Sequence, residues 1–277
     1  MTFNIRYDDG SDGPNAWSRR RALALETIRA HDPALLGLQE ATAVQMADVA
    51  GALPGCSTVD GDRVDEDHGD GPAVFYRSNR FDLRDQGRFW LSDTPHEEGS
   101  VSWPNDWAPR SCRWVRLRDR LADRELVFAS THFDTNAGGW MPSAQTIHVE
   151  LDRIAAGAPV ILAGDFNCAA GSDAHDYLRR AAEYRDAWTE AGHADEGVLT
   201  FNDFTPSTRF SSELDGANSR IDWILLRGPL ACVGAVIDFT HRGDLLPSDH
   251  YPVAALIEWI PPLTSTAGGS VVAPTRA

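Results

Sequence analysis

Val160–Asn167 has the sequence VILAGDFN: four apolar residues, a glycine, and then Asp165 and Asn167 at a spacing of two. A short apolar run rich in β-branched residues predicts a buried strand. The spacing of two places the Asp165 and Asn167 side chains on one face of that strand. A carboxylate and an amide held together there can bind water, a hard cation or an oxyanion. Gly-Asp and Asn also form ordinary turns, so this stretch alone leaves both interpretations open.

Similar apolar segments lie on both sides of this strand, separated by helix-like segments. Strands are predicted at 1–7, 35–39, 73–76, 89–91, 113–117, 126–131, 221–226, 231–239 and 253–258. Helices are predicted at 19–30, 43–53, 143–156 and 172–182, with Ser18, Thr42 and Ser172 as N-caps. Hairpin-like strand pairs mixed with helical crossovers predict an α/β (α+β) fold, a four-layer α/β-sandwich with two packed mixed β-sheets flanked by helices.

Composition narrows the classes of function. The net charge of −16 opposes a broad grip on long nucleic acid, which needs a basic surface, so we expect no stable binding to it. No apolar stretch approaches the ~18 residues that a membrane span requires, so no membrane association is expected. The four cysteines are widely spaced, with no CxxC pair, and are expected to be reduced. Without a visible signal peptide we expect a cytoplasmic protein, and secretion stays open if the true N-terminus is longer.

The domain organisation is expected to be simple. Residues 1–260 contain all the predicted strands and helices and are expected to form one domain, present as a monomer. Residues 261–277 are rich in Pro, Thr, Ser, Gly and Ala, which predicts a disordered tail. The acidic, glycine-containing segment 60–70 predicts a solvated loop.

Polar residues in or at the ends of the predicted strands are the main functional signal. They are Asn4, Glu40, His132, Asp165, Asn167, Asp222, Asp249 and His250. Ligands bind at such strand ends in layered folds. A carboxylate such as Glu40 after a buried run is costly unless it is compensated, and Mg²⁺ or Mn²⁺ would compensate it with oxygen ligation. Glu40 could instead be a helix N-terminal charge.

Six motifs occur in the order MTFNIRY (1–7), LLGLQE (35–40), STHFD (130–134), LAGDFN (162–167), SRIDWIL (219–225) and PSDHYPV (247–253). Over residues 1–258 the chain resembles the endonuclease/exonuclease/phosphatase superfamily with the DNase I-like fold, and within it a bacterial deadenylase-like branch. The superfamily includes DNase I-like nucleases, inositol polyphosphate 5-phosphatases and sphingomyelinases. The resemblance implies a four-layer sandwich and Mg²⁺-dependent hydrolysis of phosphate esters.

The resemblance also implies roles for individual residues. Glu40 would be the main metal ligand, with Asn4 and Asp249 beside it. His250 would face the scissile phosphate and be oriented by Asp222, as a base is oriented in acyl-transfer enzymes. His132 would contact the phosphate or assist the leaving oxygen, Asp165 would position or deprotonate the attacking water, and Asn167 would donate to the developing oxyanion. Whether Asp165 or His250 is the general base stays open.

Other positions carry two interpretations. Arg6 stands where some nucleases of the superfamily have an Asp, which makes a second metal site less favoured. Arg110 would bind a phosphate oxygen bidentately or be a surface charge, and Tyr76 would line the pocket or pack in the core. Tryptophans 17, 103, 107 and 140 lie in polar loops, where they would stack on bases or sugars or would cover the core.

The leading hypothesis is a Mg²⁺- or Mn²⁺-dependent phosphodiesterase or phosphomonoesterase acting on a small or terminal phosphate. Water would attack the phosphorus with assistance from metal, histidine and aspartate. One alternative is an endonuclease or exonuclease on DNA or RNA. The other, from a different class, is a catalytically silent binding module on the same fold.

Overall fold

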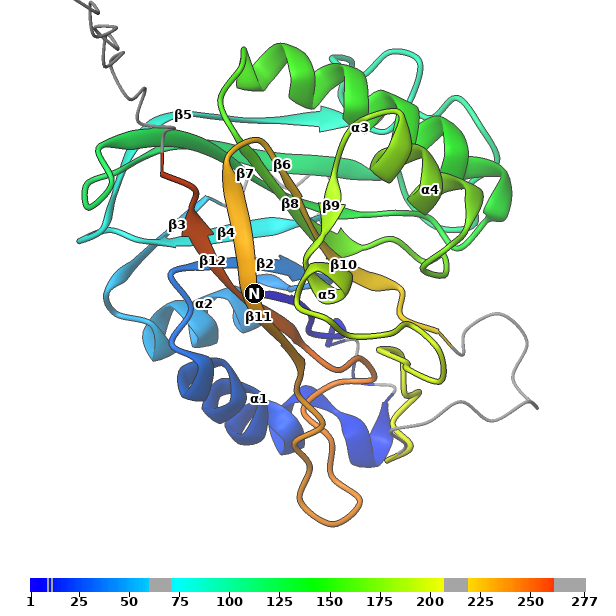
Figure 1. The fold of residues 1–277 in the computed structure, drawn as a ribbon. Helices are drawn as coiled ribbons and strands as arrows, with labels where there is room; N and C mark the ends of the chain where they lie inside the picture. The colour runs from blue at the N-terminus through cyan, green and yellow to red at the C-terminus, as the bar shows by residue number, and fades with distance from the viewer. Residues whose placement is uncertain (9, 11, 60–70, 207–218, 262–277) are drawn as a thin grey trace, which may run out of the picture.

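The computed structural model describes residues 1–8, 10, 12–59, 71–206 and 219–261. The predicted acidic loop at 60–70 and all but the first residue of the predicted tail lie outside the described residues. Within the described ranges the elements form two mixed β-sheets with helices on their outer faces (Figure 1).

The first sheet is formed by the two ends of the chain. Its order is β11-β12-β1-β2-β4-β3. The strands are β1 (Thr2–Asn4), β2 (Leu35–Gln39), β3 (Cys56–Val59), β4 (Ala73–Arg77), β11 (Leu230–Ile237) and β12 (Val253–Trp259). β1 runs parallel to β2 and antiparallel to β12, so the ends of the chain meet at the centre of this sheet.

The second sheet is formed by the middle of the chain. Its order is β5-β6-β7-β8-β10-β9. The strands are β5 (Phe81–Trp90), β6 (Ser111–Asp119), β7 (Arg124–His132), β8 (Val160–Asp165), β9 (Arg185–Asp186) and β10 (Asp222–Arg227). β7 and β8 are parallel, joined by a helical crossover, and β10 pairs antiparallel with β8.

The helices cover the two outer faces. They are α1 (Trp17–His31), α2 (Ala43–Ala52), α3 (Trp140–Ala155), α4 (Asp173–Arg180) and the short α5 (Ala187–Glu190), with 3₁₀ turns at Gly13–Asn15 and Ala137–Gly139. Figure 1 shows α1 and α2 on the outside of the first sheet, and α3 and α4 on the outside of the second. The predicted four-layer sandwich is confirmed.

Two predicted helix caps are confirmed and one is wrong. Thr42 forms a capping box with Gln45, and Ser172 accepts a hydrogen bond from the His175 amide. The first helix does not begin after Ser18. Its N-cap is Ala16, because the chain enters the helix directly from the 3₁₀ turn, and Ser18 lies inside the first helical turn.

Three apolar clusters hold the four layers together. The central one packs residues of both sheets, such as Val74 and Phe128, against each other. A second lies between β5–β8 and α3 and includes Leu162 and Ile147, and a third lies between β1–β2 and α1 and includes Phe3 and Ile28. Alternate residues of the central strands therefore belong to different clusters, as the pleat requires.

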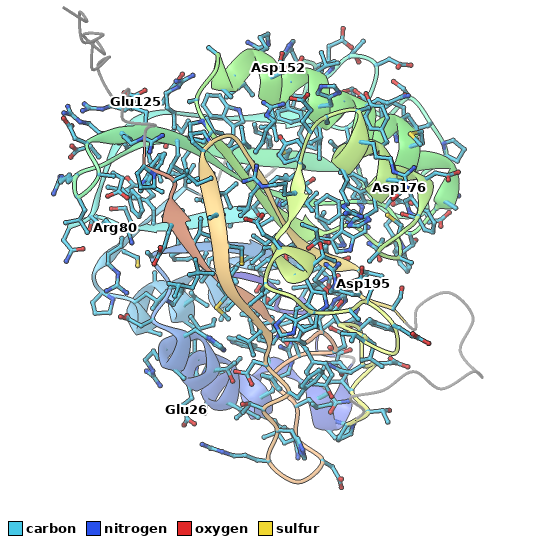
Figure 2. The ribbon with its side chains drawn as sticks, in the orientation of Figure 1. Glu26, Arg80, Glu125, Asp152, Asp176 and Asp195 are labelled. Atoms are coloured by element: carbon cyan, nitrogen blue, oxygen red, sulfur yellow. The ribbon has the colours of Figure 1, made fainter. Side chains whose placement is uncertain are left out.

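Charged side chains lie mainly on the outside. Figure 2 shows labelled examples at the periphery, such as Glu125, Asp152 and Asp176. The predicted reduced state of all four cysteines agrees with the structure, where each is free. Among the helices of the described ranges, none is long and apolar enough to cross a bilayer.

Candidate active site

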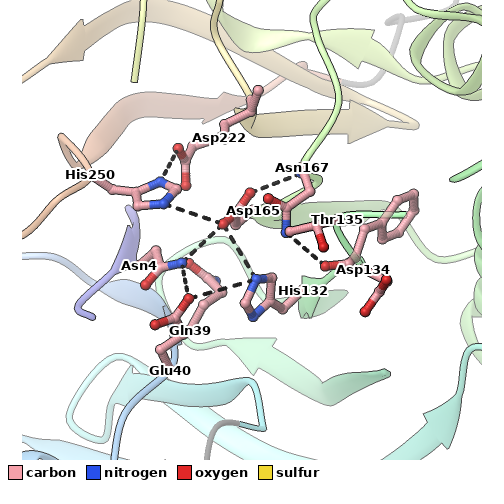
Figure 3. Close-up of polar contacts among 12 residues, drawn as sticks. Asn4, Gln39, Glu40, His132, Asp134, Thr135, Asp165, Asn167, Asp222 and His250 are labelled. Atoms are coloured by element: carbon pink, nitrogen blue, oxygen red, sulfur yellow. Dashed lines mark hydrogen bonds and ion pairs between the residues drawn. The ribbon is translucent and has the colours of Figure 1, made fainter. Parts of the chain in front are cut away.

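The site lies where the central strands of both sheets end. In the second sheet, the parallel register of β7 and β8 places His132 opposite Asp165, and the antiparallel register of β10 places Asp222 opposite Asp165. In the first sheet, Asn4 ends β1 opposite Gln39, the last residue of β2, and Glu40 follows. The polar residues predicted at these strand ends therefore meet at one end of the sandwich (Figure 3).

Asp165 is the centre of the cluster and is almost fully buried. Its Oδ2 accepts a hydrogen bond from Asn4 Nδ2 at 2.9 Å and lies 3.4 Å from His132 Nε2 and 3.6 Å from His250 Nε2. Its Oδ1 accepts a hydrogen bond from the backbone N–H of Asn167 at 2.9 Å. Burial raises the pKa of Asp165 to about 7. One carboxylate oxygen thus faces two histidines, His132 from the neighbouring strand of the same sheet and His250 from the segment before β12 (Figure 3).

His250 is paired with a carboxylate behind its ring. Its Nδ1 lies 2.9 Å from Asp222 Oδ2, and its ring packs edge-on against Phe201. Burial alone would lower the pKa of His250, but the Asp222 and Asp165 carboxylates together raise it well above the ordinary value. Nδ1–H therefore points at Asp222, and Nε2 faces Asp165 as the exchangeable position.

His132 has the opposite environment. Arg110 Nη1 lies 3.0 Å from His132 Nδ1, and a guanidinium can only donate, so Nδ1 must be the acceptor. Nε2 therefore carries the proton and points toward Asp165. Burial, followed by the charges of Arg110 and His250, lowers the pKa of His132 well below its ordinary value. His132 is a neutral donor, whereas His250 holds its proton more tightly.

The opposite pKa shifts of His132 and His250 give the two histidines different chemical roles. Titratable groups whose environments push their pKa values apart are the usual signature of separate acid and base roles. His250 can exchange a proton at Nε2 near Asp165, while His132 can donate a hydrogen bond from Nε2 without losing its proton. A phosphate bound between them would lie beside a proton-exchanging group, His250, and a hydrogen-bond donor, His132.

Glu40, Asn4 and Asp249 form the acidic side of the site. Asn4 Nδ2 donates to Glu40 Oε1 at 3.0 Å as well as to Asp165, so the amide bridges the two carboxylates. Within the described ranges, Glu40 Oε2 accepts only a long hydrogen bond from the Tyr7 backbone N–H, at 3.3 Å. Burial raises the pKa of Asp249, and the Glu40 charge adds to this. Arg6 lies 3.9 Å from Asp249 as its countercharge.

This donor set fits a hard divalent cation. Two carboxylates repel one another here, and Glu40 keeps an oxygen that is only weakly satisfied. Carboxylate oxygens are the ligands that Mg²⁺ and Mn²⁺ prefer. As oriented, Asn4 presents its nitrogen to the carboxylates and its Oδ1 to the Arg6 amide, so it supports the site by fixing Glu40.

A second group of possible ligands lies deeper. Asp165, Asp222 and His250 bring one ligand atom each within 4.8 Å of one another, so this buried cluster could hold a metal. In the structure, however, Asp222 already accepts from His250, and Asp165 accepts from Asn4. Asp222 Oδ1 is buried without a hydrogen-bond partner in the described chain, so this cluster also keeps an oxygen free for a cation.

Three positions just after the strands adopt left-handed backbone conformations without being glycine. They are Arg6 (φ 53°), Glu40 (φ 61°) and Asn167 (φ 50°). Each turns the chain directly after β1, β2 or β8, where the site lies. Such conformations are rare for residues with side chains and concentrate at functional sites.

Three predicted site residues are placed differently from the expectation. Asn167 Nδ2 donates to the Phe133 carbonyl, so one of its amide hydrogens is already engaged. Arg110 is buried behind His132, with Nη1 on the imidazole and Nε on Asp134, so it is not the surface charge that the sequence also allowed. Tyr76 is not at the site. It packs in the central core opposite Leu35, at the far end of β2 from Glu40.

The sequence analysis missed several supporting residues. Arg20 is fully buried and donates to the carbonyls of Ile5, Arg6 and Pro247, which flank Asn4 and Asp249. Arg20 lies three residues before Leu23, on the buried face of α1. An Arg on an apolar helix face indicates a buried guanidinium with nearby acceptors, because leaving it without them is costly.

The region between the sheets holds a second missed feature. Gln39 Nε2 donates to Ser130 Oγ at 3.0 Å, directly beneath the site. A Cβ at Gly37 would lie 2.8 Å from the same Ser130 Oγ, so the glycine allows the two sheets to approach here. Gln39 and Ser130 therefore fix the spacing between the strand ends that carry Glu40 and His132.

Comparison with known proteins agrees with this architecture. The model of the endonuclease/exonuclease/phosphatase family matches residues 1–250. A mannosyl-6-phosphatase from Bacteroides thetaiotaomicron is similar at 27% identity and a TM-score of 0.81, over 93% of this chain and 98% of the other. A protein of unknown function from Enterococcus faecalis is similar at 26% identity and a TM-score of 0.81, over 93% and 98%.

More distant structures share the fold alone. The human Nocturnin catalytic domain, solved with a bound sulfate anion, matches at 19% identity and a TM-score of 0.72, over 93% of this chain and 92% of the other. No curated protein matches the sequence. The family match covers nearly the whole described chain, and its motifs contain the clustered residues. The chain therefore belongs to the endonuclease/exonuclease/phosphatase family, whose members are phosphoric ester hydrolases.

Proposed function

We propose that this protein is a divalent-metal-dependent phosphoesterase that releases or cleaves a small or terminal phosphate ester by attack of water. The observation that supports this most directly is the position of Asp165 Oδ2 between the Nε2 atoms of His132 and His250. The two histidines differ in protonation because their partners differ. Arg110 faces one ring and Asp222 faces the other.

Each residue then has a defined task. A water bound at Asp165 loses its proton to the Asp165 carboxylate, beside the imidazolium of His250 that Asp222 stabilises. His132 donates its Nε2–H to a phosphoryl oxygen, where negative charge develops. Asn4 holds Asp165 and Glu40 at a fixed separation, and Asn167, whose Nδ2 has one hydrogen engaged by the Phe133 carbonyl, would donate the other to the developing oxyanion.

Glu40 and Asp249 are the residues that would hold Mg²⁺ or Mn²⁺. The cation would supply charge neutralisation at the phosphoryl oxygens. Arg6, which partly neutralises Asp249, occupies the place of an acidic residue and favours one cation over two.

A small substrate is favoured over long nucleic acid. The net charge of −16 opposes binding of a polyanion, and counterion release, the main source of non-specific affinity, needs a basic surface. The similarity to a mannosyl-6-phosphatase supports a phosphomonoester on a sugar as one candidate.

A substrate panel tests the proposal. It contains bis-p-nitrophenyl phosphate, p-nitrophenyl phosphate, mannose 6-phosphate, glycerol 3-phosphate, oligoadenylate and plasmid DNA, each with Mg²⁺, with Mn²⁺ and with EDTA. We expect metal-dependent turnover of small esters that His250→Ala abolishes and that the distant surface variant Leu121→Ala retains. Turnover of plasmid or oligoadenylate alone would establish a nuclease instead. Absence of all turnover would leave the silent binding module.

A further inference from the structure

The four loop tryptophans have different surroundings. Trp17 is buried in α1, and Trp103 and Trp140 pack against the apolar cluster beneath α3. Trp107 is 73% exposed and belongs to none of the three core clusters of the described chain. Covering the core therefore accounts for three of them but not for Trp107.

The exposed indole is nevertheless held in place. Trp107 Nε1 donates to Thr135 Oγ1 at 3.1 Å, and its backbone amide donates to Asn105 Oδ1 at 3.0 Å. The Thr135 hydroxyl in turn donates to Asp106 Oδ2 at 3.1 Å. With the indole N–H engaged, the part of the ring that remains free is its apolar face.

The loop that carries Trp107 is joined to the catalytic cluster. Asp134 Oδ1 accepts from the Asp106 amide at 2.8 Å, and Asp134 Oδ2 accepts from Arg110 Nε at 3.3 Å. Arg110 then donates to His132. A continuous chain of hydrogen bonds therefore runs from the loop at 105–107, through two buried charged residues, to the imidazole that faces Asp165.

The two loops also pack closely beside this chain of bonds. A Cβ at Gly139 would lie 2.9 Å from Trp103 Cδ1, and one at Gly138 would lie 3.4 Å from Pro104 Cγ. Asn136 Nδ2 also donates to Asp106 Oδ1 at 2.9 Å. The segments 103–110 and 133–139 are thus held together before any ligand binds. Binding of a ligand to the indole would therefore cost little conformational entropy of the loop.

We propose that Trp107 is a specificity-determining residue that stacks on the ring of a phosphorylated sugar whose phosphate lies at Asp165, His132 and His250. The inference rests on the proposed function and specifies its substrate class. The C–H groups on a sugar face are slightly positive and fit the negative face of an aromatic ring. Ring hydroxyls can donate to the carboxylate of the adjacent Asp106, whereas that charge repels the polyanionic backbone of a nucleic acid.

Substrate selectivity provides the test. Steady-state rates are measured for mannose 6-phosphate, which has a ring, and glycerol 3-phosphate, which has none. For Trp107→Ala we expect the ratio of kcat/KM for the sugar over glycerol phosphate to fall about tenfold, mainly through KM, because a stacking contact is lost. Trp107→Phe should recover most of the ratio. The exposed control Leu121→Ala should leave it unchanged.

Each outcome has a definite meaning. An unchanged ratio in a folded Trp107→Ala overturns the inference while metal-dependent turnover of glycerol phosphate upholds the proposed function. Equal losses on both substrates would show that Trp107 acts by holding His132 and would also overturn it, as would a loss confined to oligoadenylate. If the wild type hydrolyses neither ester with any metal, the proposed function itself fails, and the inference with it.

Discussion

Arg110 Nη1 lies 3.0 Å from Nδ1 of His132, and this contact fixes the tautomer of the imidazole. Because the guanidinium has no acceptor, His132 must carry its proton on Nε2, toward Asp165. Sequence analysis left two interpretations of Arg110 open, a bidentate phosphate ligand or a surface charge. In the structure Arg110 is buried and contacts His132 and Asp134.

The first prediction concerns this contact. Arg110→Met should lower kcat about 10- to 100-fold, the usual effect of removing a residue that orients a catalytic imidazole. It should also raise the pKa of His132, because the Arg110 charge helps to lower it. NMR titration of the imidazole nitrogens reports both tautomer and pKa. Arg110→Lys, which keeps the charge, is the control. An unchanged tautomer in Arg110→Met would contradict the assignment.

The second prediction concerns His250 and Asp222. His250→Ala should lower kcat by roughly 10²–10⁴-fold, as expected for a general base or acid. Asp222→Asn should cost less and act on the same step, so the double variant should be far from additive. Because Asp222 raises the pKa of His250, its loss should move the limb of the kcat–pH profile that His250 controls to lower pH.

Melting curves accompany these rates, because a buried pair also contributes to stability. Both variants should stay folded and still bind Mn²⁺, since neither residue is a proposed main ligand of the metal. Near-wild-type kcat in a folded His250→Ala would mean that Asp165 alone activates the water.

The third prediction concerns the metal. Glu40→Gln keeps the shape of the side chain and a contact with Asn4 but removes the charge that a cation needs. We expect Mn²⁺ affinity, measured by calorimetry without substrate, to fall at least about tenfold. The exposed variant Glu97→Gln should bind as the wild type does. Equal affinities, or full turnover in EDTA, would place the metal elsewhere or remove it from the reaction.

The strand ends of the site could be predicted from sequence because their signals are local. β2 was predicted with its observed bounds, Leu35–Gln39, and Val160–Asp165 was recognised from an apolar run followed by a carboxylate. Parallel pairing within each sheet then brings Asn4 beside Gln39 and His132 beside Asp165. Asp222 and His250 join them through antiparallel β10 and the segment before β12, and the packing of one sheet on the other completes the cluster.

Other features depend on partners that are distant in sequence. β5 begins at Phe81 rather than Phe89, because an edge strand faces solvent and carries charges that hide its pattern. The two residues of β9 and the four of α5 are too short to show a period. Tyr76 and Trp107 illustrate the same limit, because only tertiary packing decides which aromatic is buried.

The fourth prediction concerns Arg20, which the sequence analysis did not identify. Its guanidinium binds the carbonyls of Ile5 and Arg6 beside Asn4, and that of Pro247 beside Asp249. Arg20→Met should lower the free energy of unfolding by about 3–5 kcal/mol, because several buried carbonyls lose their donor. Urea unfolding measures the change, with the exposed neighbour Arg19→Met as control. A loss below about 1 kcal/mol would show that water replaces the guanidinium.

The last prediction concerns stability in acid and lies away from the active site. His31 Nε2 is 2.8 Å from Asp238 Oδ2, which joins the end of α1 to the segment after β11. This hydrogen bond, supported by Thr240, lowers the pKa of Asp238 from 3.8 to about 2. A carboxylate with a lowered pKa in the folded state stabilises the protein above its unfolded pKa and loses that contribution as the pH falls through the folded value. The difference in unfolding free energy between wild type and Asp238→Asn should therefore be largest near pH 6 and shrink from about pH 4 toward pH 2. Urea titrations at a series of pH values measure it, with the exposed Asp244→Asn as the matched control. A difference that stays constant across this range would mean that the His31 contact does not depend on the charge of Asp238.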